Sequence, residues 1–231
     1  RLELIDDNFP SVGILMGRRA LPKVNPSINT SGHLFVLDDL SPPLDWSCLF
    51  KDPSLPLEIE IGSGKGLFIN TSAVEVPERN FIGVELAKRY AVFAAARLAR
   101  KKTENAVMIS GDGLQFMAEF VAANTLDAVH VYFPDPWWKE RHRKRRVMRE
   151  SLVVDVERTL KPGGKLHFWT DVKEYFDSTL ELIPTVCNLA GPYEVKANAP
   201  SHNLDYRTHF ERRMRLHDKP VHRSLFKKPC D

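Results

Sequence analysis

The fold is most constrained by an alternation of two kinds of segment along the chain. From residue 57 to residue 170, short runs of apolar and β-branched residues alternate with longer segments of helical composition. Strands that alternate with helices favour a parallel sheet covered on both faces. The sequence therefore predicts an α/β fold with a doubly wound, mostly parallel sheet. The predicted strands are LEIEI at 57–61, NFIGVE at 80–85, NAVMIS at 105–110, LDAVHVYF at 126–133 and GKLHFWT at 164–170, and the predicted helices lie near 66–76, 87–102, 112–123 and 147–160.

The segments on either side of this region give weaker signals. Residues 1–56 are rich in Pro, Asn and Ser and show no sustained period, so we expect an irregular N-terminal extension packed on a domain formed by 57–231. After residue 172, one helix is followed by weak strand signals at YEVKA (193–197) and RTHFERRMRL (207–216). These two signals predict an antiparallel C-terminal hairpin at one edge of the sheet.

The composition excludes several classes of protein. At 231 residues and 43% hydrophobic content, the chain can bury a core, and none of its apolar runs approaches the length needed to span a membrane. Cys48, Cys187 and Cys230 are far apart and odd in number, which argues against a zinc site and against a disulfide framework. The start of the sequence also lacks the pattern of a secretory signal. We therefore expect a cytoplasmic protein that contacts no membrane and binds no metal.

Acidic residues lie at or just beyond the carboxyl ends of four predicted strands. The carboxyl ends of parallel strands meet at one rim of the sheet, and ligands of open α/β sheets bind there. The first strand also runs into a glycine loop, GSGKG. The sequence thus predicts a ligand site made of Glu60, Glu85, Asp112 and Asp135, with Gly62 and Gly64 in the loop.

The glycine spacing and the charge of the rim limit the identity of the ligand. The loop lacks the phosphate-binding P-loop pattern, and Leu67 stands where a dinucleotide fingerprint requires Gly. Glu85, 19 positions after Gly66, can accept hydrogen bonds from both hydroxyls of a ribose. Four carboxylates would repel a polyphosphate, whereas they suit the amine and sulfonium of S-adenosylmethionine. Any one of these acids could instead be a solvated loop residue or a helix cap, and Asp112 directly precedes a predicted helix.

A second unusual segment, VYFPDPWWKERHRKRR, spans residues 131–146. Pro134 and Pro136 restrict the backbone on both sides of Asp135, and the tryptophans that follow offer flat faces of the kind that hold nucleobases. The basic residues after them would hold a phosphate backbone and place one nucleotide at the rim. The alternatives are a solvated helix start or a nuclear-localisation patch.

These motifs together resemble the tRNA (guanine-N7-)-methyltransferases, from about residue 57 to residue 216. The likeness rests on EIGSGKG, GVE ending at Glu85, GD at 111–112, YFPDPWWK, KRR, TD at 170–171 and THFE at 208–211. It implies a Rossmann-like domain over 57–231 that transfers a methyl group from S-adenosylmethionine to N7 of the guanine at position 46, in the variable loop of tRNA. One departure is Trp138, where relatives often carry Pro or His; it concerns the shape of the pocket rather than the reaction.

The resemblance also implies roles for individual residues. Asp135 would be catalytic and would contact the cofactor together with Glu60, Glu85 and Asp112. Substrate contacts would come from Lys139, Asp171, Thr208, His209, Phe210 and Glu211, and RNA contacts from Arg141, His142, Arg143, Lys144, Arg145 and Arg146. A methyltransferase that acts on another RNA and a non-catalytic RNA-binding module stay open as alternatives, as do the monomeric and the homodimeric state.

Overall fold

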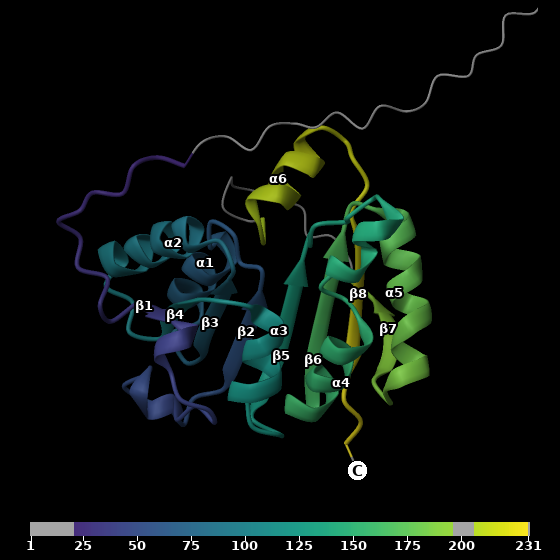
Figure 1. Cartoon of the computed structure of the whole chain (residues 1–231), viewed down its shortest axis with the longest axis horizontal. Helices are drawn as coiled ribbons and strands as arrows, with labels where there is room; N and C mark the ends of the chain where they lie inside the picture. Colours follow the sequence, from purple (N-terminus) through teal and green to yellow (C-terminus); the bar gives the residue numbers. More distant parts are fainter. Residues whose placement is uncertain (1–20, 196–205, 231) are drawn as a thin grey trace, which may run out of the picture.

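The five apolar runs predicted as strands form the centre of one sheet in the computed structural model, which describes residues 21–195 and 206–230 (Figure 1). Each predicted strand is confirmed to within a few residues. The fifth begins four residues earlier than expected, because Pro162, Gly163 and Gly164 continue it through an irregularity in its pairing with β5 instead of ending it in a turn. The strands are β2 Leu57–Ile61, β3 Asn80–Glu85, β4 Ala106–Ser110, β5 Leu126–Tyr132 and β6 Leu160–Thr170.

The order of strands places a switch point at the centre of the sheet. The order is β1-β4-β3-β2-β5-β6-β8-β7, and the pairs from β1 through β6 are all parallel. The chain therefore proceeds outward from β2 in one direction and then returns to add β5 on the other side. In such sheets the crevice beyond β2 and β5 is where ligands bind.

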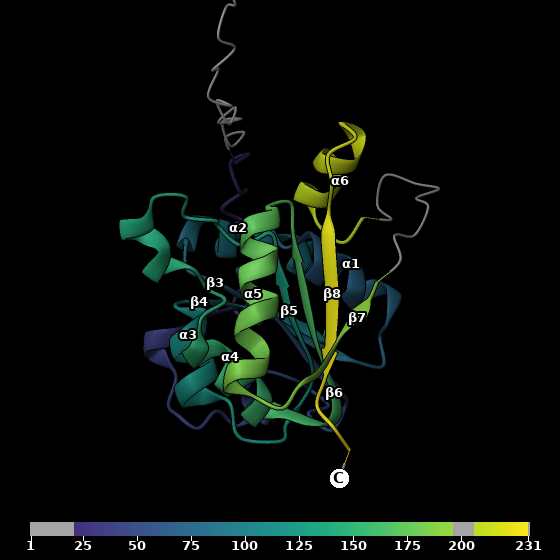
Figure 2. The same cartoon turned by 90° about the vertical axis from the view of Figure 1, so that its right-hand side faces the viewer.

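Helices cover both faces of the sheet, as predicted (Figures 1 and 2). On one face, Phe68 and Ile69 pack with Ala94 and Leu98 in one hydrophobic cluster. On the other face, a larger cluster contains the apolar residues of three helices. The first face carries α1 Leu67–Glu75 and α2 Lys88–Lys101, and the second carries α3 Gly113–Gln115 with the π-helical turn η3 Phe116–Phe120, α4 Glu150–Thr159 and α5 Lys173–Val186.

One edge strand comes from the segment before residue 57. β1, Leu34–Val36, pairs in parallel with β4, and Leu37 directly after it is fully buried in the core. The sequence predicts no strand here, because three residues are too few to show a period of two. At least part of the region before residue 57 therefore extends the sheet itself.

The other edge carries the predicted antiparallel hairpin, but with a different second strand. β7, Ala190–Glu194, pairs antiparallel with β8, His222–Lys227, and β8 pairs antiparallel with β6. The strand predicted at 207–216 is wrong, because His209–Leu216 forms helix α6. Thr208 caps this helix, and T-x-x-E before a helical run is a capping-box pattern that outweighs the strand propensity of the segment. Positions 196 and 197 of the predicted YEVKA strand lie outside the described residues.

Candidate active site

The carboxylate of Glu60 lies in the sheet at the switch point, almost out of contact with solvent. Glu60 is the penultimate residue of β2, its exposed fraction is 2%, and its Oε2 atom has no hydrogen-bond partner among residues 21–195 and 206–230. Burial raises the pKa of Glu60 well above its usual range, and the nearby carboxylate of Glu85 raises it further. An unpaired buried acid is costly for a folded protein. A cationic group next to Glu60 would remove that cost.

Glu85, at the end of β3, shapes the glycine loop. Its Oε2 accepts a hydrogen bond from the backbone N–H of Gly64 at 2.8 Å, and its Oε1 accepts one from the N–H of Ala87 at 2.9 Å. The loop is therefore held toward the two acids. Gly62 has a φ of +76° and a Cβ added there would meet nothing within 4 Å, so this part of the loop borders open space.

Asp112, after β4, is exposed and caps a helix. It is the N-cap of α3, and its Oδ1 accepts a hydrogen bond from the N–H of Leu114 at 2.8 Å. Asp112 therefore does cap a helix, which is the alternative role that the sequence allows for it. A cap that uses one carboxylate oxygen leaves acceptor capacity on the other.

The loop after β5 turns sharply before Asp135. Phe133 adopts a φ of +49°, and its N–H donates to the carbonyl of Trp169 at the end of β6 with a distance of 2.7 Å. Asp135 itself is exposed at the rim. The ring of Trp137 stacks on His142, with centroids 5.9 Å apart, and lies under the guanidinium of Arg145 at 5.1 Å. Trp137 is therefore engaged within the protein, whereas Trp138 is 67% exposed.

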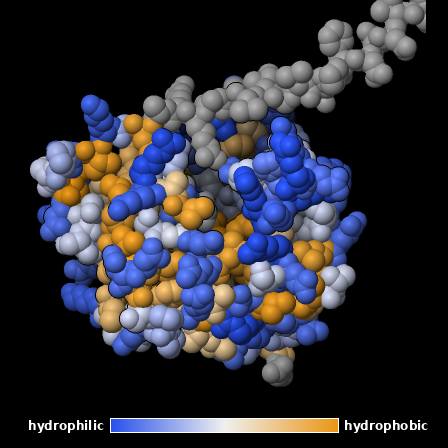
Figure 3. Space-filling model, viewed as in Figure 1, coloured by the Kyte–Doolittle hydropathy of each residue, from blue (hydrophilic) through white to orange (hydrophobic). Residues whose placement is uncertain are grey.

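The basic segment contains residues with two different environments. Arg146 is only 8% exposed: its guanidinium donates to the carbonyl of Pro136 and to both oxygens of Glu174, and it lies 4.5 Å over the ring of Tyr175. Arg146 thus fastens the Asp135 loop to α5 and does not face solvent. The exposed cations lie beside the top of α5, where hydrophilic residues gather in Figure 3. They are Lys139, Arg141, Arg143, Lys144 and Arg145, around the 3-10 helix η4 Glu140–Arg145, with the partly exposed His142 among them.

The THFE motif forms the start of helix α6. The Oγ1 of Thr208 accepts a hydrogen bond from the N–H of Glu211 at 2.9 Å, and Glu211 Oε2 accepts one from the N–H of Arg207 at 2.7 Å. The first contact is the N-cap bond of a capping box, whereas the second goes to the residue before the cap instead of to the cap itself. Glu211 is 3% exposed, and its Oε1 also accepts from the guanidinium of Arg223 at 2.9 Å. The carboxylate thus has three partners within the protein once Arg215 at 3.5 Å is included.

Helix α6 brings the predicted substrate residues over the rim. Burial lowers the pKa of His209 to about 4, with further lowering by Arg97 of α2 and Lys65 of the glycine loop. The ring of Phe210 lies 5.0 Å from that of Phe133 in the loop after β5. Asp171, after β6, has a raised pKa because burial outweighs the opposing charges of Arg213 and His222.

A cavity of about 590 Å³ extends from this rim along the sheet. Its wall near the rim includes Tyr132, Trp169 and Glu211, and further along the strands it includes Glu58 and His130. The sequence predicts no role for Tyr132 or Glu58. One feature of the sequence could have indicated a role for Tyr132. His130 and Tyr132 are two residues apart, so their side chains lie on the same face of a buried strand, where apolar side chains are expected.

Two general features bear on ligands and membranes. Across 21–195 and 206–230, no cluster of three or more His, Cys, Asp or Glu side chains has an arrangement that could hold a metal ion. Within the same ranges, every helix is too short or too polar to cross a bilayer.

Solved methyltransferases share this fold. A methyltransferase from Pyrococcus furiosus gives a TM-score of 0.54 at 15% identity over 76% of this chain and 76% of its own. The 16S rRNA (adenine(1408)-N(1))-methyltransferase from Catenulisporales acidiphilia, solved with its cosubstrate, gives 0.55 at 18% identity over 81% and 92%. At these identities the likeness concerns the fold alone. A family model described as a putative methyltransferase matches residues 54–224. The fold, the glycine loop and the acidic rim therefore define a Rossmann-like methyltransferase.

Two curated relatives narrow this class to one family. The tRNA (guanine-N(7)-)-methyltransferase of Rhodopirellula baltica is 44% identical over 227 residues, which cover 96% of this chain and 83% of that protein. The protein of the same name from Ralstonia pickettii is 34% identical over 189 residues, with coverages of 81% and 72%. The chain belongs to the tRNA (guanine-N7-)-methyltransferase family.

Proposed function

We propose that this chain transfers a methyl group from S-adenosylmethionine to N7 of the guanine at position 46 of tRNA, giving 7-methylguanosine. The reaction follows from family membership. The observation that carries the proposal in the structure is the buried carboxylate of Glu60 at the switch point of a methyltransferase sheet, whose Oε2 atom meets no hydrogen-bond donor in the described part of the chain. The tRNA substrate makes the cytoplasm the expected location.

The residues at the rim fit a cofactor that is positively charged and carries a ribose. Glu60 offers an acceptor without a partner, and the space beside Gly62 is open. We assign cofactor contacts to Glu60, Glu85, Asp112, Asp135 and the loop glycines. S-adenosylmethionine supplies an electrophilic methyl group on a positively charged sulfur.

The protein's task in this reaction is chiefly alignment. Guanine N7 has a lone pair and no proton, so its attack on the methyl carbon requires no general base. Holding the two reactants in line converts an encounter of two molecules into a reaction within one complex, which can supply about 7–11 kcal/mol of the barrier. The purine gains positive charge as the bond forms, and the carboxylate of Asp135 would stabilise that charge.

Recognition of guanine falls to α6 in this proposal. The Watson–Crick edge of guanine carries two N–H donors, and Glu211 is an acceptor of the right kind. A carboxylate has about four lone-pair sites, and the contacts of Glu211 with described residues take up three of them. Because Glu211 is buried, a base reaches it only when the side chains around the start of α6 move. Adenine lacks this pair of donors and would leave the acceptor unpaired.

The exposed cations around η4 would hold the tRNA backbone. They neutralise phosphate charge without reading sequence, so they position the nucleotide while the rim and α6 select it. Arg146 supports this role indirectly, since its contacts with Pro136 and Glu174 join the basic segment to the Asp135 loop.

The test is a product analysis. Bacterial tRNA transcripts are incubated with the protein and S-adenosylmethionine, digested to nucleosides and analysed by mass spectrometry, with a transcript carrying adenine at position 46 as the control. We expect 7-methylguanosine from the first transcript only. Methylation of both transcripts would refute the assignment of position 46. Absence of methylation, together with an unchanged melting temperature in the presence of S-adenosylmethionine, would favour a non-catalytic RNA-binding module.

A further inference from the structure

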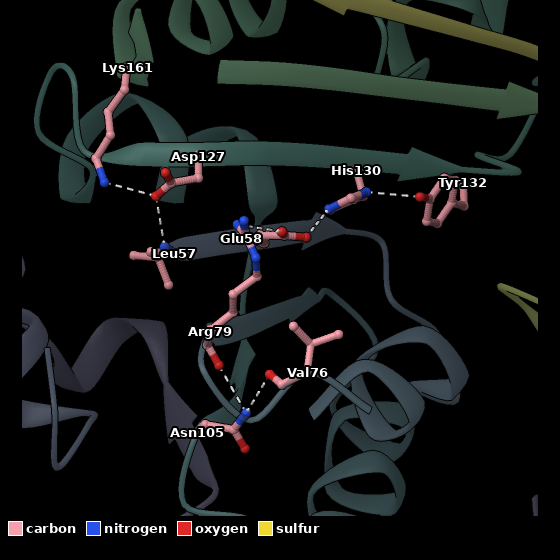
Figure 4. Close-up of polar contacts among 9 residues, drawn as sticks. All are labelled: Leu57, Glu58, Val76, Arg79, Asn105, Asp127, His130, Tyr132 and Lys161. Carbon is pink, nitrogen blue, oxygen red and sulfur yellow. Dashed lines mark hydrogen bonds and ion pairs between the residues drawn. The ribbon is translucent and has the colours of Figure 1, made fainter. Parts of the chain in front are cut away.

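A continuous chain of hydrogen bonds crosses the sheet beneath the active site (Figure 4). Arg79 NH1 donates to Glu58 Oε1 at 3.1 Å, and Glu58 Oε2 lies 2.8 Å from Nε2 of His130. The other ring nitrogen of His130, Nδ1, lies 2.8 Å from the hydroxyl of Tyr132. The backbone carbonyl of Arg79 is in turn held by Asn105 at 2.9 Å. The chain thus links the turn before β3 with β2 and β5.

The direction of each hydrogen bond follows from the ionisation of its members. Contacts with His130 and Arg79 outweigh burial and lower the pKa of Glu58, so this carboxylate is charged and can only accept. Burial lowers the pKa of His130 despite Glu58, so the imidazole is neutral, and burial raises the pKa of Tyr132. Nε2–H of His130 therefore donates to Glu58, and the Tyr132 hydroxyl donates to Nδ1. Each polar group in this hydrogen-bonded chain has a partner.

The chain ends at the residue that leads into the catalytic loop. Tyr132 is the last residue of β5, and Asp135 is three residues further along. The Tyr132 ring also lies edge-on to Phe68 of α1, with centroids 5.4 Å apart, and 4.9 Å from Trp169 of β6. Packing surrounds the ring, and the hydroxyl bond connects it through His130 to the charged Glu58.

We propose that Tyr132 is a positioning residue for methyl transfer, oriented by Glu58 through His130, and that it sets the conformation of the 133–138 loop that carries Asp135. This inference rests on the proposed function in one respect, the role given to Asp135. The first turn of the loop is strained at Phe133, whose φ is +49°, so the surrounding structure must hold it. Tyr132 supplies a fixed point immediately before that turn.

Replacement of Tyr132 by Phe tests the proposal with one atom removed. The ring packing stays, whereas Nδ1 of His130 loses its donor. We expect kcat to fall about tenfold, as small misplacements at a reacting centre do, while the KM for tRNA and the affinity for S-adenosylmethionine stay within about twofold. A variant that keeps the wild-type kcat, or whose KM rises while kcat holds, overturns the proposal.

A neighbouring histidine provides the matched control. His167 lies beside His130 on β6, with stacked rings 4.8 Å apart, and burial lowers its pKa to about 2. In the part of the chain that the structure describes, its side chain forms no hydrogen bond. We expect His130→Gln to reproduce the loss of kcat and His167→Gln to leave kcat near the wild-type value. Equal losses in both variants would indicate a general effect of packing and would overturn the proposal.

Two measurements that do not depend on turnover complete the test. Nitrogen NMR of the wild-type imidazole at pH 7 should show His130 as the neutral Nε2–H tautomer, since Glu58 accepts from Nε2 while burial and the charge of Arg207 lower the pKa of the ring. An Nδ1–H tautomer, or titration near 6.5, would contradict the hydrogen-bond direction on which the proposal depends. Hydrogen exchange at the loop amides that carry a hydrogen, those of Phe133, Asp135, Trp137 and Trp138, should accelerate in Tyr132→Phe and not in His167→Gln.

The outcomes separate this inference from the proposed function. If the wild-type protein forms no 7-methylguanosine but the loop exchange responds to Tyr132→Phe, the function is wrong and the positioning of the loop stands. If the wild type is active and neither kcat nor loop exchange responds, only the positioning role is wrong.

Discussion

At the scale of single residues, Glu60 shows how a binding site costs stability. Its carboxylate is buried without a partner at Oε2, and Glu85 adds repulsion. We expect Glu60→Gln to stabilise the protein without cofactor by about 1–3 kcal/mol at pH 7, because the unpaired buried acid is removed. The same variant should lose most of the rise in melting temperature that S-adenosylmethionine gives the wild type. Thermal denaturation with and without cofactor measures both effects, and a variant less stable than wild type would contradict the first.

The raised pKa of Glu60 also predicts a pH dependence with a definite sign. The unfolded chain releases this proton near the usual glutamate value of 4.5, whereas the folded protein holds it to higher pH. The native state then binds more protons, so the free energy of unfolding falls as pH rises from about 4.5 toward the folded pKa, by about 1.4 kcal/mol per pH unit. This contribution should vanish in Glu60→Gln. Denaturant unfolding across that range, with both proteins compared, measures it.

Asp135 is the residue at which binding and chemistry should separate. It is exposed at the rim, so its replacement by Asn should leave the fold and the basic segment around η4 intact. We expect methyl transfer to slow by about 100-fold, the effect of losing one group that stabilises developing charge, while tRNA affinity is kept. Single-turnover methylation and a filter-binding assay measure the two quantities. Near-normal turnover would remove Asp135 from the chemistry.

At the scale of elements, two glycines of the glycine loop have different roles. Gly66 begins α1 with a φ of +64°, and a Cβ there would lie 2.6 Å from the Cβ of Ala94 in α2. Gly62 has a similar φ but borders open space. We expect Gly66→Ala to destabilise the fold by about 1–3 kcal/mol through overpacking. Gly62→Ala should cost less stability and act mainly on cofactor affinity, and calorimetry of unfolding and of binding distinguishes the two.

The THFE motif at the start of α6 has a structural role as well as a proposed role in substrate binding. Thr208 caps the start of the helix and Glu211 bonds the backbone just before the cap, and the same helix carries Phe210 to the loop after β5. The family motif is therefore a structural signal as well as a set of proposed substrate contacts. Loss of the cap typically costs about 1 kcal/mol, so an activity loss at Thr208 must be compared with the stability of the helix.

At the scale of the whole molecule, the distribution of charge matters more than its total. The formal net charge is only +3, yet cations are concentrated around η4. We expect neutralisation of Arg143, Lys144 and Arg145 together to weaken tRNA binding and to reduce the slope of log affinity against log salt by about 1 for each phosphate that is no longer neutralised. Binding isotherms at several salt concentrations test this. An unchanged slope would identify the segment as solvated surface.

Much of the architecture could be predicted from the sequence, because local patterns determine it. Five strands and the helices between them follow from apolar runs and helical stretches, and the glycine loop and the acids mark the rim. The family resemblance rests on motifs of the same local kind, and the relatives confirm it.

The tertiary structure decided what local patterns leave open. A three-residue strand such as β1 exists only because β4 offers it an edge, and α6 replaces a predicted strand because Thr208 caps the helix. Arg146 looks like its basic neighbours in sequence, but only packing against Tyr175 and Glu174 places it inside the protein. The link from Glu58 through His130 to Tyr132 joins residues up to 74 positions apart, and no local pattern can encode a contact between strands that are adjacent only after folding.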